Sequence, residues 1–182
     1  EHVSIAKQRM PNFPIYMQYG WTPKSHFRAA AIIRSMSYDN LTAHKTESEI
    51  GWGVLASATF NVMNCLQVYG QGVYGKGIGQ FLNDMSLLNV DVVPNPEKEG
   101  KMQVLPMMGW FAGMQYNFSP KVFITSTYGQ SRLYSHDGYP TTPSEQYRYG
   151  QYLNATLFWN ITSDLQAGAE YLRGWRTDFN GD

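Results

Sequence analysis

The sequence predicts an all-β protein, an up-and-down antiparallel β-barrel of the kind that crosses a membrane. Three observations lead to this fold class: apolar and polar residues alternate along successive segments, short and long connections follow one another strictly, and aromatic residues recur near both ends of the predicted strands. Charged residues are 15% of the 182-residue chain and aromatic residues another 15%. This composition favours strands and tight turns over helices.

The alternation has the two-residue period of strands with one apolar face. In the segment 52–60, for example, Trp52, Val54 and Phe60 share one face, while Gly53 and Ser57 share the other. A strand that crosses a membrane needs only about 9–11 residues. Eight strands are predicted, at about 13–20, 25–36, 52–61, 65–75, 108–118, 121–130, 147–159 and 164–174. The apolar parity predicts that six residues face lipid or a partner subunit: Trp52, Ala56, Trp110, Met114, Leu157 and Ala169.

The connections between these strands alternate in length. Four are short and rich in Asn, Ser and Pro, which supply turn chemistry; they lie at 21–24, 61–64, 117–120 and 160–163. Three are long, at about 37–51, 76–107 and 132–146. Barrels of the outer membrane have short turns on one rim and longer loops on the other. We therefore expect the long loops to share one side and the short turns to share the opposite side.

The second long loop contains a segment, 80–88, that could form a short amphipathic helix. Such a helix would either fold inward and narrow a pore or cap the rim, and the sequence leaves both options open. Aromatic residues support the barrel: Trp52, Tyr74 and Trp110 lie near the long-loop rim, and Phe60 and Trp159 lie near the short-turn rim. Aromatic belts at both interfaces are typical of barrels in lipid.

Four charged residues fall on the polar parity of their strands: Arg28, Arg34, Arg148 and Glu170. They either belong to an ordinary solvated face or line a pore, where arginine attracts anions and Glu170 holds an arginine by pairing with it. These four are the candidate solute-contacting residues.

Other classes of function find little support. The 14 basic and 14 acidic residues leave no net charge, so there is no electrostatic case for nucleic acid. His26, His44 and His136 are scattered over a turn and two loops, and no metal or cofactor is expected. No serine or cysteine has the sequence signature of a catalytic nucleophile, so the chain is not expected to be an enzyme.

Several segments, in order along the chain, resemble the DcaP-like outer-membrane porins. They are 31–40, 51–54, 73–79, 127–129, 154–160 and 168–176. The resemblance implies a sixteen-stranded trimeric barrel in a Gram-negative outer membrane that passes small, often anionic, solutes. Arg34 and Glu170 match charged positions of that family's pattern. The chain supplies about half of such a barrel's strands.

We therefore expect residues 1–182 to form a single barrel region, incomplete at both ends, of a porin in the bacterial outer membrane. Its expected partners are membrane lipid, small solutes and two further copies in a homotrimer. The alternatives are a smaller barrel that binds an apolar ligand, as lipocalins do, a structural barrel, or an outer-membrane lipase or protease. A ligand-binding barrel needs an apolar interior, whereas the interior parity here is polar.

Overall fold

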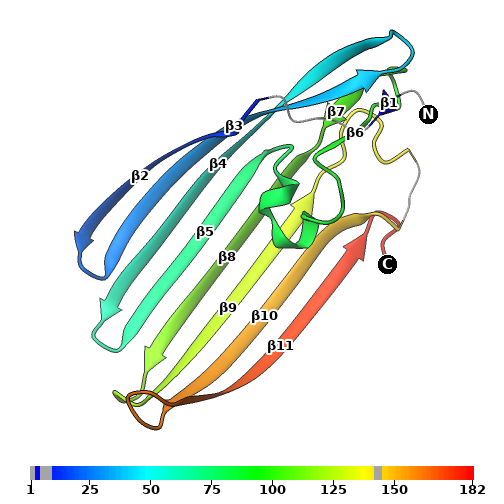
Figure 1. The fold of residues 1–182 in the computed structure, drawn as a ribbon. Coiled ribbons are helices and arrows are strands. Elements are labelled where there is room, and N and C mark those ends of the chain that lie inside the picture. Colours follow the sequence, from blue (N-terminus) through cyan, green and yellow to red (C-terminus); the bar gives the residue numbers. More distant parts are fainter. Residues whose placement is uncertain (1–2, 5–9, 142–144) are drawn as a thin grey trace.

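The computed structural model describes residues 3–4, 10–141 and 145–182 and contains one large antiparallel sheet (Figure 1). Its long strands are β2 (Phe13–Thr22), β3 (Ser25–Asn40), β4 (Lys45–Met63), β5 (Leu66–Lys76), β8 (Pro106–Asn117), β9 (Val122–Leu133), β10 (Tyr147–Asn160) and β11 (Gln166–Asp178). A two-residue strand, β1 (Val3–Ser4), pairs with the end of β3 that β2 does not reach. The predicted all-β fold is confirmed.

Each long strand pairs with the next long strand along the chain, so the topology is up-and-down. The predicted strands all exist, with ends that differ from the prediction by a few residues except in the first long connection. Within the described residues the sheet stays open, with β1 and β2 along one edge and β11 along the other. No helix among the described residues is both long enough and apolar enough to span a membrane.

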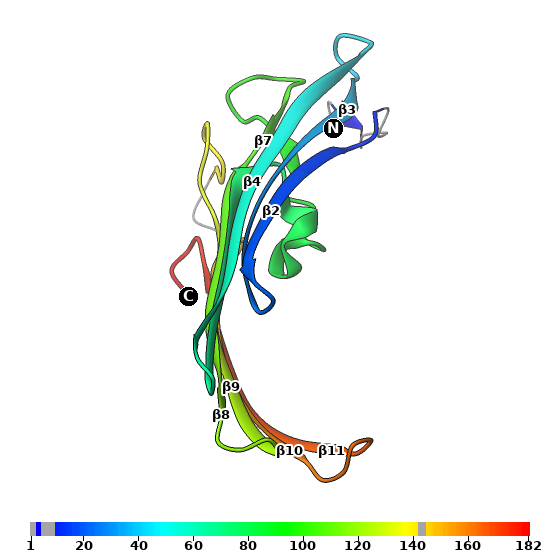
Figure 2. The ribbon, with the colours of Figure 1, turned by 90° about the vertical axis from the view of Figure 1, so that its left-hand side faces the viewer.

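The sheet is strongly curved and has a concave and a convex face (Figure 2). The segment 77–91, which we call the inner segment, lies against the concave face and contains two short 3₁₀ helices, η1 (Gly79–Phe81) and η2 (Asn83–Met85). A Cβ added to Gly53 would lie 3.0 Å from the Ile78 side chain, and one added to Gly109 would lie 2.6 Å from Leu82. Both glycines, and the residues that share their parity in each strand, therefore face the concave side of the sheet.

Strand alternation then assigns the opposite parity to the convex face. Cross-strand pairing carries this assignment across the sheet, since Ala56 pairs with Gly72, which pairs with Trp110. The six residues predicted to face away from the interior share this convex face, as predicted: Trp52, Ala56, Trp110, Met114, Leu157 and Ala169. The sheet therefore has one apolar face and one polar face.

The predicted loop at 37–51 is wrong. β3 continues to Asn40 and β4 begins at Lys45, so only residues 41–44 form the connection. Pairing is unbroken from Ile33–Trp52 up to Asn40–Lys45. This upper hairpin has polar residues on both faces, with the pairs Ser37–Ser48 and Asp39–Thr46 on one and Asn40–Lys45 on the other. It therefore lacks the apolar alternation from which strands are recognised.

The two rims differ as predicted in most respects. The short turns lie at one end of the sheet, and the segments 77–105 and 134–146 connect strands at the other end (Figure 1); residues 142–144 of the third predicted loop lie outside the described residues. The turn at 41–44 is a short turn on the long-loop rim. It ends a protruding hairpin and does not reflect a missing strand.

The second long loop is folded on itself. It contains the two 3₁₀ helices and a small hairpin of β6 (Val92–Pro94) and β7 (Met102–Val104). The sequence predicts instead that 80–88 could form a single short helix. Gly77, where the chain leaves β5, has φ +65°, a conformation that glycine adopts without strain. A buried hydrophobic cluster forms between this loop and strands β8, β9 and β10 and comprises Ile78, Leu82, Met85, Val90, Val93, Leu105, Met107, Leu133 and Tyr147.

One cross-strand pair inside the sheet is packed unusually closely. The Tyr69 ring lies over its partner Gly113, and its hydroxyl is 2.9 Å from Oγ1 of Thr127, one strand further on. A Cβ on Gly113 would lie 2.6 Å from the Tyr69 ring and 2.7 Å from the Ser126 carbonyl oxygen. Gly113 therefore leaves the space that lets this ring lie flat on the sheet.

Replacing Gly113 by alanine should destabilise the protein by roughly 1–3 kcal/mol, because the new methyl group meets the backbone of β9 as well as Tyr69. Gly174→Ala is the matched control, since a Cβ there meets the Gln151 carbonyl oxygen at 3.7 Å, an ordinary van der Waals distance. We expect urea unfolding of the full-length protein in detergent, followed by tryptophan fluorescence, to show a lower midpoint for Gly113→Ala only. Equal midpoints would contradict the packing described here.

Candidate functional site

The polar concave face and the inner segment that lies on it form the candidate site. Arg28 belongs to this face and is exposed. Its Nε and Nη2 donate to the Oε1 atom of Gln18, at 3.0 and 2.7 Å, and its guanidinium lies 5.4 Å from the Tyr16 ring centroid. These neighbours are neutral, so they hold the side chain in place and leave its positive charge uncompensated.

Arg34 also lies on the concave face, but it is buried and paired with a carboxylate. Its Nη1 donates to Oδ2 of Asp91 at 2.8 Å and to the carbonyl oxygen of Gly77 at 2.8 Å. The second oxygen of Asp91, Oδ1, accepts the backbone N–H of Gly79. Arg34 and Asp91 together therefore hold the inner segment on the sheet. Asp91 also neutralises Arg34, one of the arginines expected either to lie on a solvated face or to attract anions.

A second anchor holds the inner segment at η2. The Ser131 hydroxyl donates to the Asp84 carboxylate and lies within hydrogen-bonding distance of the Tyr147 hydroxyl. Tyr147 also donates to the carbonyl oxygen of Ser131 at 3.1 Å. These contacts join η2 to β9 and β10, while Arg34 joins the same segment to β3. Of the two arrangements left open by the sequence, the inner segment adopts the inward one.

Glu170 lies on the concave parity of β11, as predicted, but its neighbours are neutral. Its Oε1 accepts from Nδ2 of Asn154 at 2.9 Å and from Oγ1 of Thr156 at 3.3 Å. The expected arginine partner is not found for Glu170 in the described part of the chain. Glu170 and Arg28 stand on strands near opposite edges of the sheet.

Strand alternation does not determine which face of the sheet the Arg148 side chain lies on. The register of β10 against β11 shifts between Tyr147 and Tyr149, which makes Arg148 the extra residue of a bulge. The prediction that it shares the polar parity with Arg28 and Arg34 assumed an unbroken strand. Alternation alone therefore does not support a concave direction for the Arg148 side chain.

Beyond the rim, a charged cluster ties the upper hairpin to the second loop. Oxygens of Glu47 lie 2.6 Å from Nζ of Lys101 and 2.8 Å from Nζ of Lys45, and the Tyr38 hydroxyl donates to Glu47 at 3.0 Å. Hydrogen bonds from Lys101 and Lys45 lower the pKa of Glu47 to about 2. Glu47 therefore remains ionised, and these contacts persist, down to strongly acidic pH.

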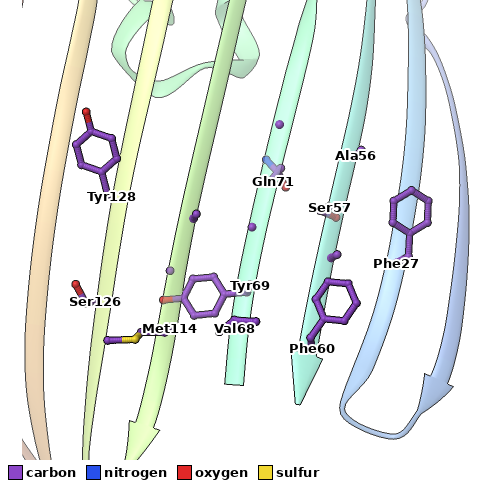
Figure 3. Close-up of a pocket in the computed structure, with 15 residues that line it drawn as sticks. Phe27, Ala56, Ser57, Phe60, Val68, Tyr69, Gln71, Met114, Ser126 and Tyr128 are labelled. Atoms are coloured by element: carbon purple, nitrogen blue, oxygen red, sulfur yellow. The ribbon is translucent and has the colours of Figure 1, made fainter. Parts of the chain in front are cut away.

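The convex face carries a shallow apolar groove, whose residues are labelled in part in Figure 3. Its floor is made by small residues, and larger side chains stand around it. The floor comprises Ala56, Ala58, Gly70, Gly72 and Ala112, and the walls include Phe27, Phe60, Val68, Met114 and Tyr128. Such a surface suits an acyl chain or the closely approaching backbone of another subunit.

Among the described residues no group of three or more His, Cys, Asp or Glu side chains could hold a metal ion. Asp91 and Asp84, which fix the inner segment, were not among the residues singled out in the sequence. Both lie in a loop without periodic pattern, and the partner of Asp91 is 57 residues away, so no local signal identified them.

No protein-family model and no curated protein matches the chain. Among solved structures, the chain is similar to the crystal structure of the outer membrane channel DcaP of Acinetobacter baumannii. The TM-score is 0.80 at 19% sequence identity, over 99% of this chain and 49% of that chain. The chain thus spans about half the length of the structure it matches.

This likeness establishes the class of fold: an antiparallel up-and-down sheet that corresponds to half of an outer-membrane channel barrel. The particular structure it matches is DcaP, so the resemblance to DcaP-like porins noticed in the sequence is confirmed at the level of the fold. The polar concave face corresponds to a barrel interior, and the convex face to a barrel exterior.

Removing the Asp91 carboxylate should release the inner segment from the sheet. In Asp91→Asn, Arg34 loses its ionic partner while staying buried, which is costly. We expect amide hydrogen exchange over 78–91 to accelerate about tenfold or more in the full-length protein, equivalent to roughly 1.4 kcal/mol. Glu97→Gln, at an exposed carboxylate of the same loop, should leave exchange unchanged. Unchanged exchange in Asp91→Asn would show that the ion pair does not hold the segment.

Proposed function

We propose that this chain is part of an outer-membrane porin of a bacterial cell, through which small hydrophilic solutes diffuse passively. The observation that carries the proposal is the two-faced sheet: an apolar convex face, a polar concave face and a loop segment folded onto the concave side. Membrane barrels with aqueous channels have these features. The likeness to half of an outer membrane channel supports the same conclusion.

The complete channel, in this proposal, is a sixteen-stranded barrel. Both edges of the described sheet, along β2 and β11, present unpaired backbone groups. Within a membrane these groups need further strands as partners, because lipid offers none. The chain itself contributes no covalent chemistry: selectivity comes from the interior charges and from the space that the inner segment leaves.

We further propose that anions are weakly preferred. Arg28 is the exposed interior cation with neutral partners, and a charge in a narrow, low-dielectric channel concentrates ions of the opposite sign. Glu170 opposes this effect from the far edge of the sheet, which limits its size. Arg34 contributes indirectly, since its charge balances that of Asp91.

Reversal potentials of the full-length protein in planar bilayers under a salt gradient test this preference. We expect Arg28→Ala and Arg34→Ala each to reduce the anion preference, since each leaves the interior one charge more negative, and Glu170→Gln to increase it. The double variant Arg34→Ala/Asp91→Ala removes a neutral pair and should leave the reversal potential close to that of the unmodified protein.

A cation-selective channel whose reversal potential is insensitive to Arg28→Ala and Arg34→Ala would overturn the proposed preference. If the protein forms no ion-conducting channels in bilayers, the porin proposal itself fails. The double variant also separates the effect of charge from the effect of releasing the inner segment, because both Arg34 variants lose that anchor.

We also propose a homotrimer, with the groove of the convex face as a contact between subunits. The small residues of its floor allow a neighbouring strand to approach closely. Gly72→Phe places a ring in the groove, and its Cβ meets nothing within 4 Å. We expect this variant to migrate as a monomer on native gels in mild detergent. Ala169→Phe, on the same face but outside the groove, should remain trimeric; trimers with both variants would exclude this contact.

A further inference from the structure

A second cleft, of about 630 Å³, lies on the concave face beneath the inner segment. Its walls come from β5, β8, β9 and β10 and from η1 and η2. We propose that this cleft is a binding site for a neutral, hydroxylated ring, that is, for a sugar moving through the channel. The inference rests on the proposed porin function and names a substrate class for it.

Aromatic rings are the first reason. Phe111 and Tyr152 on the strands and Phe81 on the inner segment are 37%, 41% and 51% exposed, respectively. All three line the cleft. Exposed rings on the convex face of the proposed porin would be covered by lipid. These three rings lie on the concave face, where they would meet water. Exposed rings grouped on a polar surface mark a place where apolar ligand surface can be covered.

Tyr69 completes the aromatic wall. Its ring stands edge-on to Phe111 with a centroid distance of 6.5 Å, and its hydroxyl is held at Thr127. The ring also lies close against Gly113, where an added Cβ would come within 2.6 Å of it. Phe111 is therefore buttressed by a fixed neighbour, and less conformational freedom has to be lost when a ligand stacks on it.

Polar groups with both donors and acceptors form the other part of the wall. Gln71 and Asn83 contribute amides, and Asp84 contributes a carboxylate that Ser131 holds in place. In the described part of the chain no hydrogen bond engages the side-chain amide of Gln71 or Asn83. Amides and carboxylates beside an aromatic face suit a sugar, whose ring has apolar C–H faces and a rim of hydroxyl groups.

The charge of the cleft selects against anions. No lysine, arginine or histidine is among the described residues that line it, and Asp84 is its charged side chain. The Arg34 guanidinium lies 5.5 Å from the centroid of the Phe81 ring, but Asp91 neutralises its charge. An anion would therefore meet the Asp84 carboxylate without a free cation, whereas neutral hydroxyl groups can donate to it. Arg28 does not line the cleft, so the anion preference and the sugar site are separate properties of the interior.

The test is the ion current through the full-length protein in planar bilayers, titrated with glucose on both sides. Sorbitol is the matched probe, because it has a similar size and viscosity and carries hydroxyl groups but has no ring to stack. We expect glucose to reduce the current at about two- to tenfold lower concentration than sorbitol, the effect of one good aromatic contact.

Variants then locate the site. Phe111→Ala and Tyr152→Ala should each abolish the difference between glucose and sorbitol. Phe158→Ala is the control: Phe158 lies on the concave parity of β10 but outside the cleft, stacked on Phe123 with ring centroids 4.8 Å apart. It should retain the difference.

Three results would overturn the proposal: equal effects of glucose and sorbitol on the unmodified channel, a preference for glucose that survives both Phe111→Ala and Tyr152→Ala, or loss of that preference in Phe158→Ala alone. In each case the channel still conducts, so the porin function stands. A protein that never conducts would instead overturn the porin function.

Discussion

The rest of the structure depends on one constraint, the pairing of backbone hydrogen bonds between neighbouring strands. A strand in lipid finds no other partner for its N–H and C=O groups, and once paired it must present its side chains alternately to two surroundings. In this chain one face of the sheet carries apolar residues such as Trp52 and Leu157, and the other carries Arg28 and Glu170. The sheet thus separates lipid-compatible from water-compatible residues without a conventional core between two layers.

The buried hydrophobic residues lie instead where the loop covers the sheet. Ile78 and Leu82 turn toward the concave face, and Gly53 and Gly109 beneath them leave room for their side chains. Two polar anchors, Arg34–Asp91 and Ser131–Asp84, fix the segment at its sides. The loop therefore supplies one side of the cleft on the concave face, since Phe81, Asn83 and Asp84 line it together with residues of the strands.

The strands and their parity could be predicted from the sequence because alternation is a local signal that each strand repeats. The upper hairpin was missed for the converse reason: Ser37, Glu47 and their neighbours lie beyond the apolar belt, and without one apolar face the pattern disappears. Arg34 was assigned to the correct face, but its pairing with Asp91 depends on how a loop folds back from 57 residues away. The face of Arg148 could not be predicted, because this residue is the extra one of a bulge. The bulge shifts the register of β10 without leaving a signature in the sequence.

The order of the strands has a consequence for how such a sheet is assembled. Because every long strand lies beside its neighbour in sequence, each new pairing closes only a modest length of chain, and the loss of chain entropy at each step is small. The sheet can therefore grow by one hairpin at a time from either edge, with no strand threaded between two others. The contact between Arg34 of β3 and Asp91 is different, since it joins residues 57 positions apart across the two intervening strands β4 and β5. It therefore closes a longer stretch of chain than the pairing of two neighbouring strands does.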